Sequence, residues 1–165
     1  MNAFTLLDWI DIAAQLDREG CCVLPPSEDC DPRGLLDHLL PIATRWLGTV
    51  AQAGALRIDT STMLPGDCAP LRQDAGVFPL QVIKLLSAPG VDFTGGECVL
   101  VEQRPRMQSR PMVLPLRRGD VAIIAAGRRP VPGSRGVVTV SMRHAISVVR
   151  SGRRVGQILT WDHHA

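Results

Sequence analysis

The sequence predicts a mainly β domain that is covered on one side by N-terminal helices, an α+β arrangement. Helical periodicity ends near residue 53, and from about Ala55 the chain becomes a series of short β-rich runs separated by turn residues. The chain has 165 residues and is 45% apolar, which is enough for one core, whereas two domains would each be marginal. We therefore predict a single domain over residues 1–165, with a helical cover over 1–53 and a β core over 55–165.

The N-terminal region predicts two helices that flank one short strand. Apolar residues recur at helical spacing over residues 6–16, and Gly20 follows as a helix stop. A strand is expected at residues 21–24, before two prolines. A second helical region is expected over residues 32–47, where Pro41 either bends the helix or begins a new one.

The rest of the chain predicts short strands separated by turns such as Pro65-Gly66-Asp67 and Gly95-Gly96. Strands at this spacing are typical of a sandwich, a jelly roll or a barrel. The stretch GRRPVPGSRG, residues 127–136, is predicted to be a surface loop. The predicted strand runs are LRIDTSTML, VFPLQVIKLLS, ECVLVEQ, MVLPL, VAIIAAG, GVVTVSMRHAISVV and RVGQILTW.

Composition argues against several classes of protein. The 5 cysteines are an odd set without C-x-x-C spacing, which favours free thiols in a reducing cytoplasm over a disulfide scaffold or a zinc site. No apolar stretch reaches the roughly 20 residues that a membrane-spanning helix needs. The net charge is only +2 and aromatic residues are 4%, so nucleic-acid binding is not expected.

A specific pattern is carried by two segments, FPLQVIKLLSAPGVDFTGGECVLVEQRPRMQSRPMVLPLRRGDVAII and GVVTVSMRHAISVVRSGRR. Its most distinctive part is FTGGE followed by EQRPRMQSR. Over roughly residues 64–161 the chain resembles bacterial iron(II)- and 2-oxoglutarate-dependent oxygenases of the prolyl-4-hydroxylase-like kind. This resemblance implies a double-stranded β-helix, that is, a jelly roll, with a shortened N-terminal helical region.

The resemblance also implies where a metal site would lie. In that family, iron is held by a His-x-Asp pair and a distant histidine, and a basic residue ten positions later binds the far carboxylate of 2-oxoglutarate. Asp74, His144 and Arg154 match the aspartate, the distant histidine and the basic residue. Arg72 stands at the first histidine, and a guanidinium has no lone pair for a metal. Asp74 and His144 would therefore be metal ligands only if iron is bound.

Further departures from the family pattern point in the same direction. The loop after Asp74 is short, Gly156 replaces a serine or threonine hydroxyl near the carboxylate, and the chain has no tyrosine. Arg72 and Asp74 are two residues apart on an expected strand, so their side chains share a face. Two alternatives follow for Arg72: it replaces the missing cation beside Asp74 and His144, or it is a solvated surface residue.

We therefore expect a degenerate oxygenase-fold enzyme that works without iron on a small acidic or carbonyl-bearing metabolite. Its reaction would be a non-redox step of biosynthesis, such as a cyclisation, isomerisation or elimination. Arg72 and Arg154 would stabilise an oxyanion, and His144 or Asp74 would move a proton. Arg154 would bind the carboxylate of the substrate or of 2-oxoglutarate. We expect no cofactor.

Two alternatives remain open. The first is an active hydroxylase that uses iron(II) and 2-oxoglutarate at a non-standard metal site. The second is a non-catalytic binding or partner protein that retains the scaffold. The expected partners are a small-molecule substrate and a second copy of the chain, because a shortened helical cover leaves more sheet to hide; neither nucleic acid nor a membrane is expected.

Overall fold

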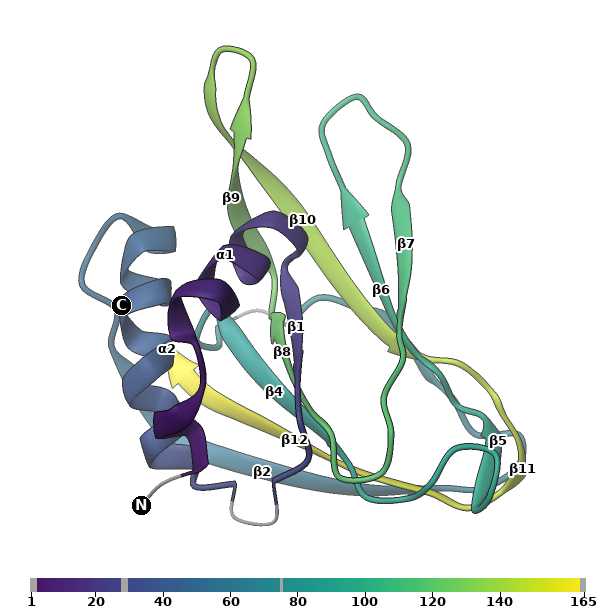
Figure 1. Cartoon of the computed structure of the whole chain (residues 1–165). Coiled ribbons are helices and arrows are strands. Elements are labelled where there is room, and N and C mark those ends of the chain that lie inside the picture. The colour runs from purple at the N-terminus through teal and green to yellow at the C-terminus, as the bar shows by residue number, and fades with distance from the viewer. Residues whose placement is uncertain (1–2, 28–29, 75, 164–165) are drawn as a thin grey trace.

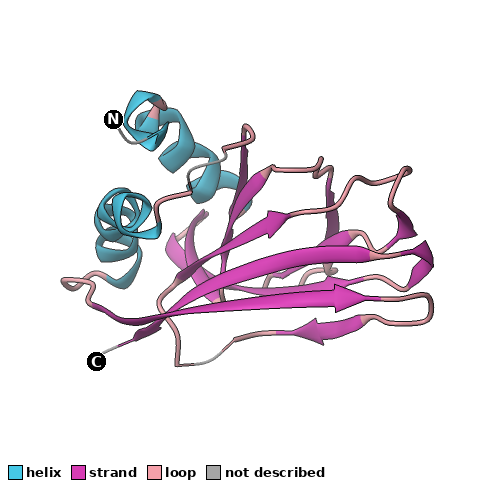
Figure 2. Ribbon diagram, turned by 90° about the horizontal axis from the view of Figure 1, so that it is seen from below, coloured by secondary structure: helices cyan, strands magenta, loops and turns pink. Residues whose placement is uncertain are grey.

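The jelly roll expected from the sequence is present in the computed structural model, which describes residues 3–27, 30–74 and 76–163. Two main antiparallel sheets form the body, and the helices lie together on one side of it (Figures 1 and 2). None of the described helices combines the length and the apolar character needed to cross a membrane.

The first helical segment begins later than the periodicity predicted. A 3-10 helix, η1 (Ala3–Leu6), leads to Asp8, whose carboxylate accepts hydrogen bonds from the backbone of Ile10 and Asp11. This N-cap starts α1 (Trp9–Glu19), and Gly20 ends it in the left-handed conformation that glycine adopts without a steric penalty. Leu6 is therefore outside α1, and it is exposed.

Helix α2 (Pro32–Leu47) is continuous through Pro41. Asp31 accepts hydrogen bonds from the backbone of Arg33 and Gly34, and Pro32 occupies the first turn, where a missing N–H costs nothing. Asp17 of α1 joins the two helices, because its carboxylate accepts hydrogen bonds from Arg45 and from the Trp46 indole.

The first sheet contains the most deeply buried strands of the protein. Residues Val121–Ala125 are buried on both faces, because the sheet lies between the helices and the second sheet. The spatial order of its strands is β1 (Cys21–Leu24), β8 (Val121–Ala125), β4 (Leu80–Leu85), β12 (Arg154–His163) and β2 (Ala53–Met63).

The second sheet supplies the opposite wall and two hairpins that extend beyond the body (Figure 1). A separate pair of short strands, β5 (Phe93–Gly95) and β11 (Val149–Gly152), closes one end. The strands of the second sheet, in spatial order, are β3 (Ala69–Arg72), β10 (Gly136–Ile146), β6 (Cys98–Gln103) and β7 (Arg110–Leu114), and β9 (Arg128–Gly133) also pairs with β10.

The prediction of a surface loop over residues 127–136 is wrong. Residues Arg128–Gly133 form β9, which pairs with β10 in a continuous antiparallel register. Pro130 and Pro132 suggested a loop. Proline is tolerated in an edge strand, because the side of the strand that faces solvent needs no N–H for a hydrogen bond to a neighbouring strand. Arg129 of this strand is 1% exposed and is part of the core.

Candidate functional site

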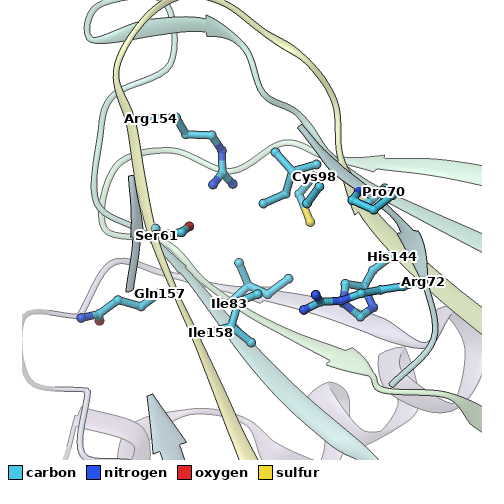
Figure 3. Close-up of a pocket in the computed structure, with 13 residues that line it drawn as sticks. Ser61, Pro70, Arg72, Ile83, Cys98, His144, Arg154, Gln157 and Ile158 are labelled. Carbon is cyan, nitrogen blue, oxygen red and sulfur yellow. The ribbon is translucent and has the colours of Figure 1, made fainter. Parts of the chain in front are cut away.

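A pocket between the two sheets brings together three of the four residues that the sequence singled out. Arg72 and His144 line it from β3 and β10, and Arg154 lines it from β12 on the opposite sheet. Figure 3 shows the Arg154 and Arg72 side chains pointing into the same space from different sides. The pocket is partly open to solvent, its free space is about 420 Å³ when the solvent at its mouth is included, and Ile83 and Ile158 contribute apolar lining.

Arg72, Asp74 and His144 form one cluster of charged and polar groups at this pocket. Arg72 and His144 are direct cross-strand partners, and the Arg72 Nε donates to His144 Nε2 at 3.5 Å. The carboxylate of Asp74 lies 3.4 Å from Arg72 Nε and 3.5 Å from His144 Nε2. The Arg72 side chain contacts Asp74 and His144, as the first alternative for Arg72 expects, and it is also 53% exposed, so water reaches it.

His144 is held as a neutral imidazole in this setting. Burial lowers its pKa, the Asp74 carboxylate raises it, and the Arg72 guanidinium lowers it further, with a net lowering from the ordinary value of 6.5. The ring is 5% exposed, and its Nε2 faces both Arg72 and Asp74. A neutral imidazole in the wall of a pocket can accept a proton from a bound ligand.

Gln81 is a member of this cluster that the sequence analysis missed. Its side chain is fully buried on β4, and its amide lies 3.3 Å from His144 Nδ1. The amide atom nearest Nδ1 is the nitrogen, which can only donate; after a flip of the amide, its carbonyl would face Nδ1, accept the ring N–H and leave Nε2 as the acceptor. The available signal was a glutamine in the run LQVIKL, whose other residues apart from Lys84 are apolar and buried.

Arg154 is the most unusual charge of the pocket. It is 2% exposed, its Nε donates to the Gly96 carbonyl at 2.8 Å, and no described residue forms an ion pair with it. Burial lowers the pKa of Arg154, but a guanidinium stays protonated at neutral pH. A buried cation without an internal anion is costly, so an anionic ligand at its terminal nitrogens would compensate it.

The residues of the cluster do not fit the iron site of the resembled family. Such a site takes two imidazoles and one carboxylate, and here the position of one imidazole holds a guanidinium that contacts both remaining donors. Within residues 3–27, 30–74 and 76–163, no group of three His, Cys, Asp or Glu side chains is placed to hold a metal.

The residues fit a carboxylate better than they fit a metal. The Arg154 guanidinium matches one end of a dicarboxylate such as 2-oxoglutarate, and Gly156 leaves space beside it. A Cβ at Gly156 would lie 3.0 Å from Arg154 Nη1, so the missing hydroxyl of the family pattern falls next to this guanidinium. The pocket thus has a basic residue, Arg154, at the position where the family pattern binds the far carboxylate, and a guanidinium, that of Arg72, at the position of the first histidine.

The signature EQRPRMQSR has a structural place outside this pocket. Glu102 of β6 is 1% exposed and forms ion pairs with Arg104 and with the buried Arg129 of β9. Burial acts to raise the pKa of Glu102, but hydrogen bonds and charge from the two arginines lower it overall. The segment forms the turn of the β6–β7 hairpin, in keeping with the role of a strand connection.

Comparison with known proteins identifies relatives of the sequence. A family model named Oxygenase-NA, described as "Oxygenase, catalysing oxidative methylation of damaged DNA", matches residues 45–165. Two Mycobacterium tuberculosis proteins, MT2286 of strain CDC 1551 / Oshkosh and Rv2227 of strain H37Rv, are both named as uncharacterized. Each is 44% identical over 115 residues, which are 66% of this chain and 49% of the relative. The chain thus spans about half the length of these relatives.

Solved structures agree on the fold. An oxidoreductase of the 2OG-Fe(II) oxygenase family from Burkholderia pseudomallei has a TM-score of 0.60 at 17% identity, covering 96% of this chain and 92% of its own. A Pseudomonas putida prolyl-4-hydroxylase has a TM-score of 0.59 at 10% identity, covering 96% of both chains. The resemblance to 2-oxoglutarate oxygenases is confirmed at the level of fold, and the family match over 45–165 shows that the chain belongs to the Oxygenase-NA family.

Proposed function

We propose that the protein binds a small acidic or carbonyl-bearing metabolite in the pocket and promotes a non-redox step on it without iron. The reaction class is a cyclisation, isomerisation or elimination in a biosynthetic pathway. The observation that carries the proposal is a guanidinium in contact with Asp74 and His144, combined with a second, buried guanidinium that has no internal counter-ion among the described residues. This set of charges favours an anion over a cation.

Each residue of the pocket has a role in such a reaction. Arg154 binds the substrate carboxylate and fixes its position. Arg72 stabilises negative charge that develops on a carbonyl oxygen, because its guanidinium already lies at the pocket wall. His144 accepts a proton at Nε2 and, once protonated, is stabilised by the Asp74 carboxylate 3.5 Å away.

Two other functions are kept as competing proposals. An active iron(II) and 2-oxoglutarate hydroxylase would hold iron on Asp74 and His144 with water in place of the third side chain. A non-catalytic binding protein would use the pocket for a ligand or a partner only. The family description names damaged DNA; from the low net charge and few aromatic residues we propose that this chain does not bind nucleic acid.

The location proposed for the protein is the cytoplasm. All 5 cysteines are free thiols, which suits a reducing compartment. Fractionation of the source cells with an antibody to the protein tests this, and recovery from a membrane or extracellular fraction would contradict it.

The deciding experiment is an anaerobic titration with iron(II) and 2-oxoglutarate, followed by the visible charge-transfer band of the chelate. Wild type is compared with Arg72→His and with Arg143→His, a control whose residue is exposed on the opposite face of β10. We expect no band in wild type or the control, and a band in Arg72→His. A band in wild type would overturn the iron-free proposal.

Nucleic-acid binding is checked separately by fluorescence anisotropy with a labelled single-stranded oligonucleotide at low salt, with and without alkylated bases. We expect no saturable binding. Saturable binding that weakens with salt would favour the DNA substrate of the family description instead.

A further inference from the structure

Strand β2 is an edge strand of unusual length and exposure. It has 11 residues, it lies at the end of the first sheet, and its described neighbour is β12 on one side only. Residues 55–62 are all exposed, and the apolar Leu56 and Ile58 are 38% and 50% exposed. Such an edge presents a row of unpaired backbone groups to any strand that can pair with it.

The other edges among the described strands are protected, and β2 is not. Strands β1 and β3 have 4 residues each, and β3 contains Pro70, while β5 and β11 of the two-stranded sheet have 3 and 4 residues. Strand β7 has 5 residues with Pro111, and β9 contains two prolines. Strand β2 contains no proline and no lysine, and its register with β12 is regular from Leu56 to Met63. Short strands and prolines are the usual defences against edge pairing, so their absence at β2 indicates an interface.

The sequence of β2 selects a second copy of itself as the occupant. Ile58 is the central residue of Ala53–Met63, and it is flanked by Arg57 and Asp59. In an antiparallel pair with its two-fold axis at Ile58, Arg57 of each copy lies opposite Asp59 of the other, on one face of the sheet. Ile58 meets Ile58 on the axis, and Leu56 meets Thr60; these residues lie on the face opposite to the Arg57–Asp59 pairs. All 11 residues of the strand find a partner in this register.

The charges needed for this pairing are available. The Arg57 side chain is 67% exposed, and its ion pair with Asp162 lies at the surface, where such pairs contribute little. Asp59 has no ion pair with a described residue, so it is free to accept one from a second copy. The pairing would also form about ten main-chain hydrogen bonds.

We propose that the protein is a two-fold symmetric dimer in which the β2 strands pair antiparallel about Ile58 and join the first sheets of two copies into one continuous sheet. Ser61 of β2 lines the pocket of the functional site, so the interface runs along one wall of that pocket. The proposal does not depend on the chemistry of the pocket.

Charge reversal tests the register directly. Light scattering after size exclusion at about 100 μM, a concentration that saturates micromolar interfaces, is expected to show a dimer for wild type. Arg57→Asp and Asp59→Arg each place like charges opposite each other twice, so each is expected to weaken the dimer about tenfold. The double variant Arg57→Asp/Asp59→Arg, and an equimolar mixture of the two single variants, are expected to dimerise again. Asp162→Asn, which removes only the internal pair of Arg57, is the control and should stay dimeric.

Cross-linking at the axis gives an independent readout. In a background without the exposed Cys68, Ile58→Cys should form an intermolecular disulfide under mild oxidation, because residues facing each other on the axis are within disulfide reach. Val91→Cys, which is exposed outside β2, should not. A monomeric wild type would overturn the proposal. So would a dimer that persists in both charge-reversal variants and in which Ile58→Cys forms no intermolecular disulfide.

Discussion

Two arginines are almost completely buried, Arg129 at 1% and Arg154 at 2% exposure, and their surroundings differ in kind. Arg129 directs its terminal nitrogens to the Glu102 carboxylate and to the Asp17 and Arg18 carbonyls at the end of α1. Arg154 has one backbone carbonyl, that of Gly96, and a pocket. A buried arginine can thus have two different roles. Arg129 has internal partners and connects elements of the fold, whereas Arg154 lacks an internal anion among the described residues and is available for a ligand.

The largest expected difference between the two arginines is the loss of stability caused by Arg129→Met. This change leaves Glu102 buried with only Arg104, and it removes the donors to the last carbonyls of α1. We expect the free energy of unfolding to fall by about 3 kcal/mol, because breaking a buried ion pair leaves an uncompensated charge. Urea denaturation measures this, with Arg128→Met, an exposed neighbour on β9, as the control. Equal stability of the two variants would contradict the role given to Arg129.

Arg154→Met should show the opposite profile. No internal ion pair is lost among the described residues, so the free energy of unfolding is expected to stay within about 1 kcal/mol of wild type or to rise. Affinity for a dicarboxylate probe, 2-oxoglutarate or succinate, is expected to fall about a hundredfold, as for the loss of a buried charge partner. Isothermal titration calorimetry compares it with Arg153→Met, whose residue is exposed. An unchanged affinity of Arg154→Met for the dicarboxylate would contradict the assignment of Arg154 as the anion-binding residue.

The pH dependence of stability tests the neutral state of His144. Its pKa is lowered in the folded protein, so the unfolded chain binds the proton more readily, and stability is retained above about pH 6.5. As the pH falls through and below this value, the free energy of unfolding should decrease with a slope of at most about 1.4 kcal/mol per pH unit for this group. The decrease should be smaller in His144→Gln. A His144→Gln profile that is parallel to wild type would show that the histidine titrates normally.

The smallest expected effect is that of Gly156→Ala. The new Cβ would approach Arg154 Nη1 to 3.0 Å, so the guanidinium must move by a few tenths of an ångström. We expect dicarboxylate affinity to fall about threefold and stability to change by less than about 0.5 kcal/mol. Calorimetry and urea denaturation on the same sample measure both. A large loss of stability would mean that the pocket is closed around Arg154.

Local signals in the sequence predicted much of the fold. The second helical region was predicted over residues 32–47, which are the bounds of α2, and β1 was predicted at its observed bounds. Strand β9 was missed because proline composition argues against a strand, and only its position at an edge of the sheet makes Pro130 and Pro132 acceptable. That position depends on pairing with β10, which local sequence does not specify.

The candidate site was predictable only as far as the family pattern reached. The spacing of His144 and Arg154 and the substitution at Arg72 marked the residues that line the pocket. Gln81 and the partners of Arg129 were not found, because each contacts residues far away in the chain: Gln81 lies 63 positions from His144, and Arg129 lies 27 from Glu102. Side-chain contacts across strands depend on register, and register is a property of the whole sheet.

The cross-strand pairing of Arg72 with His144 also has an evolutionary consequence. Two of the six arginine codons differ from a histidine codon by a single base, so where the gene uses one of these two, one point mutation gives a histidine at this position. Gly156 and the short loop after Asp74 are separate departures that such a reversion leaves in place. The sequences of related genes would therefore distinguish two histories of position 72. Frequent histidine at this position would indicate that the histidine was lost recently. Arginine that is kept while its codon varies would indicate that selection maintains the positive charge.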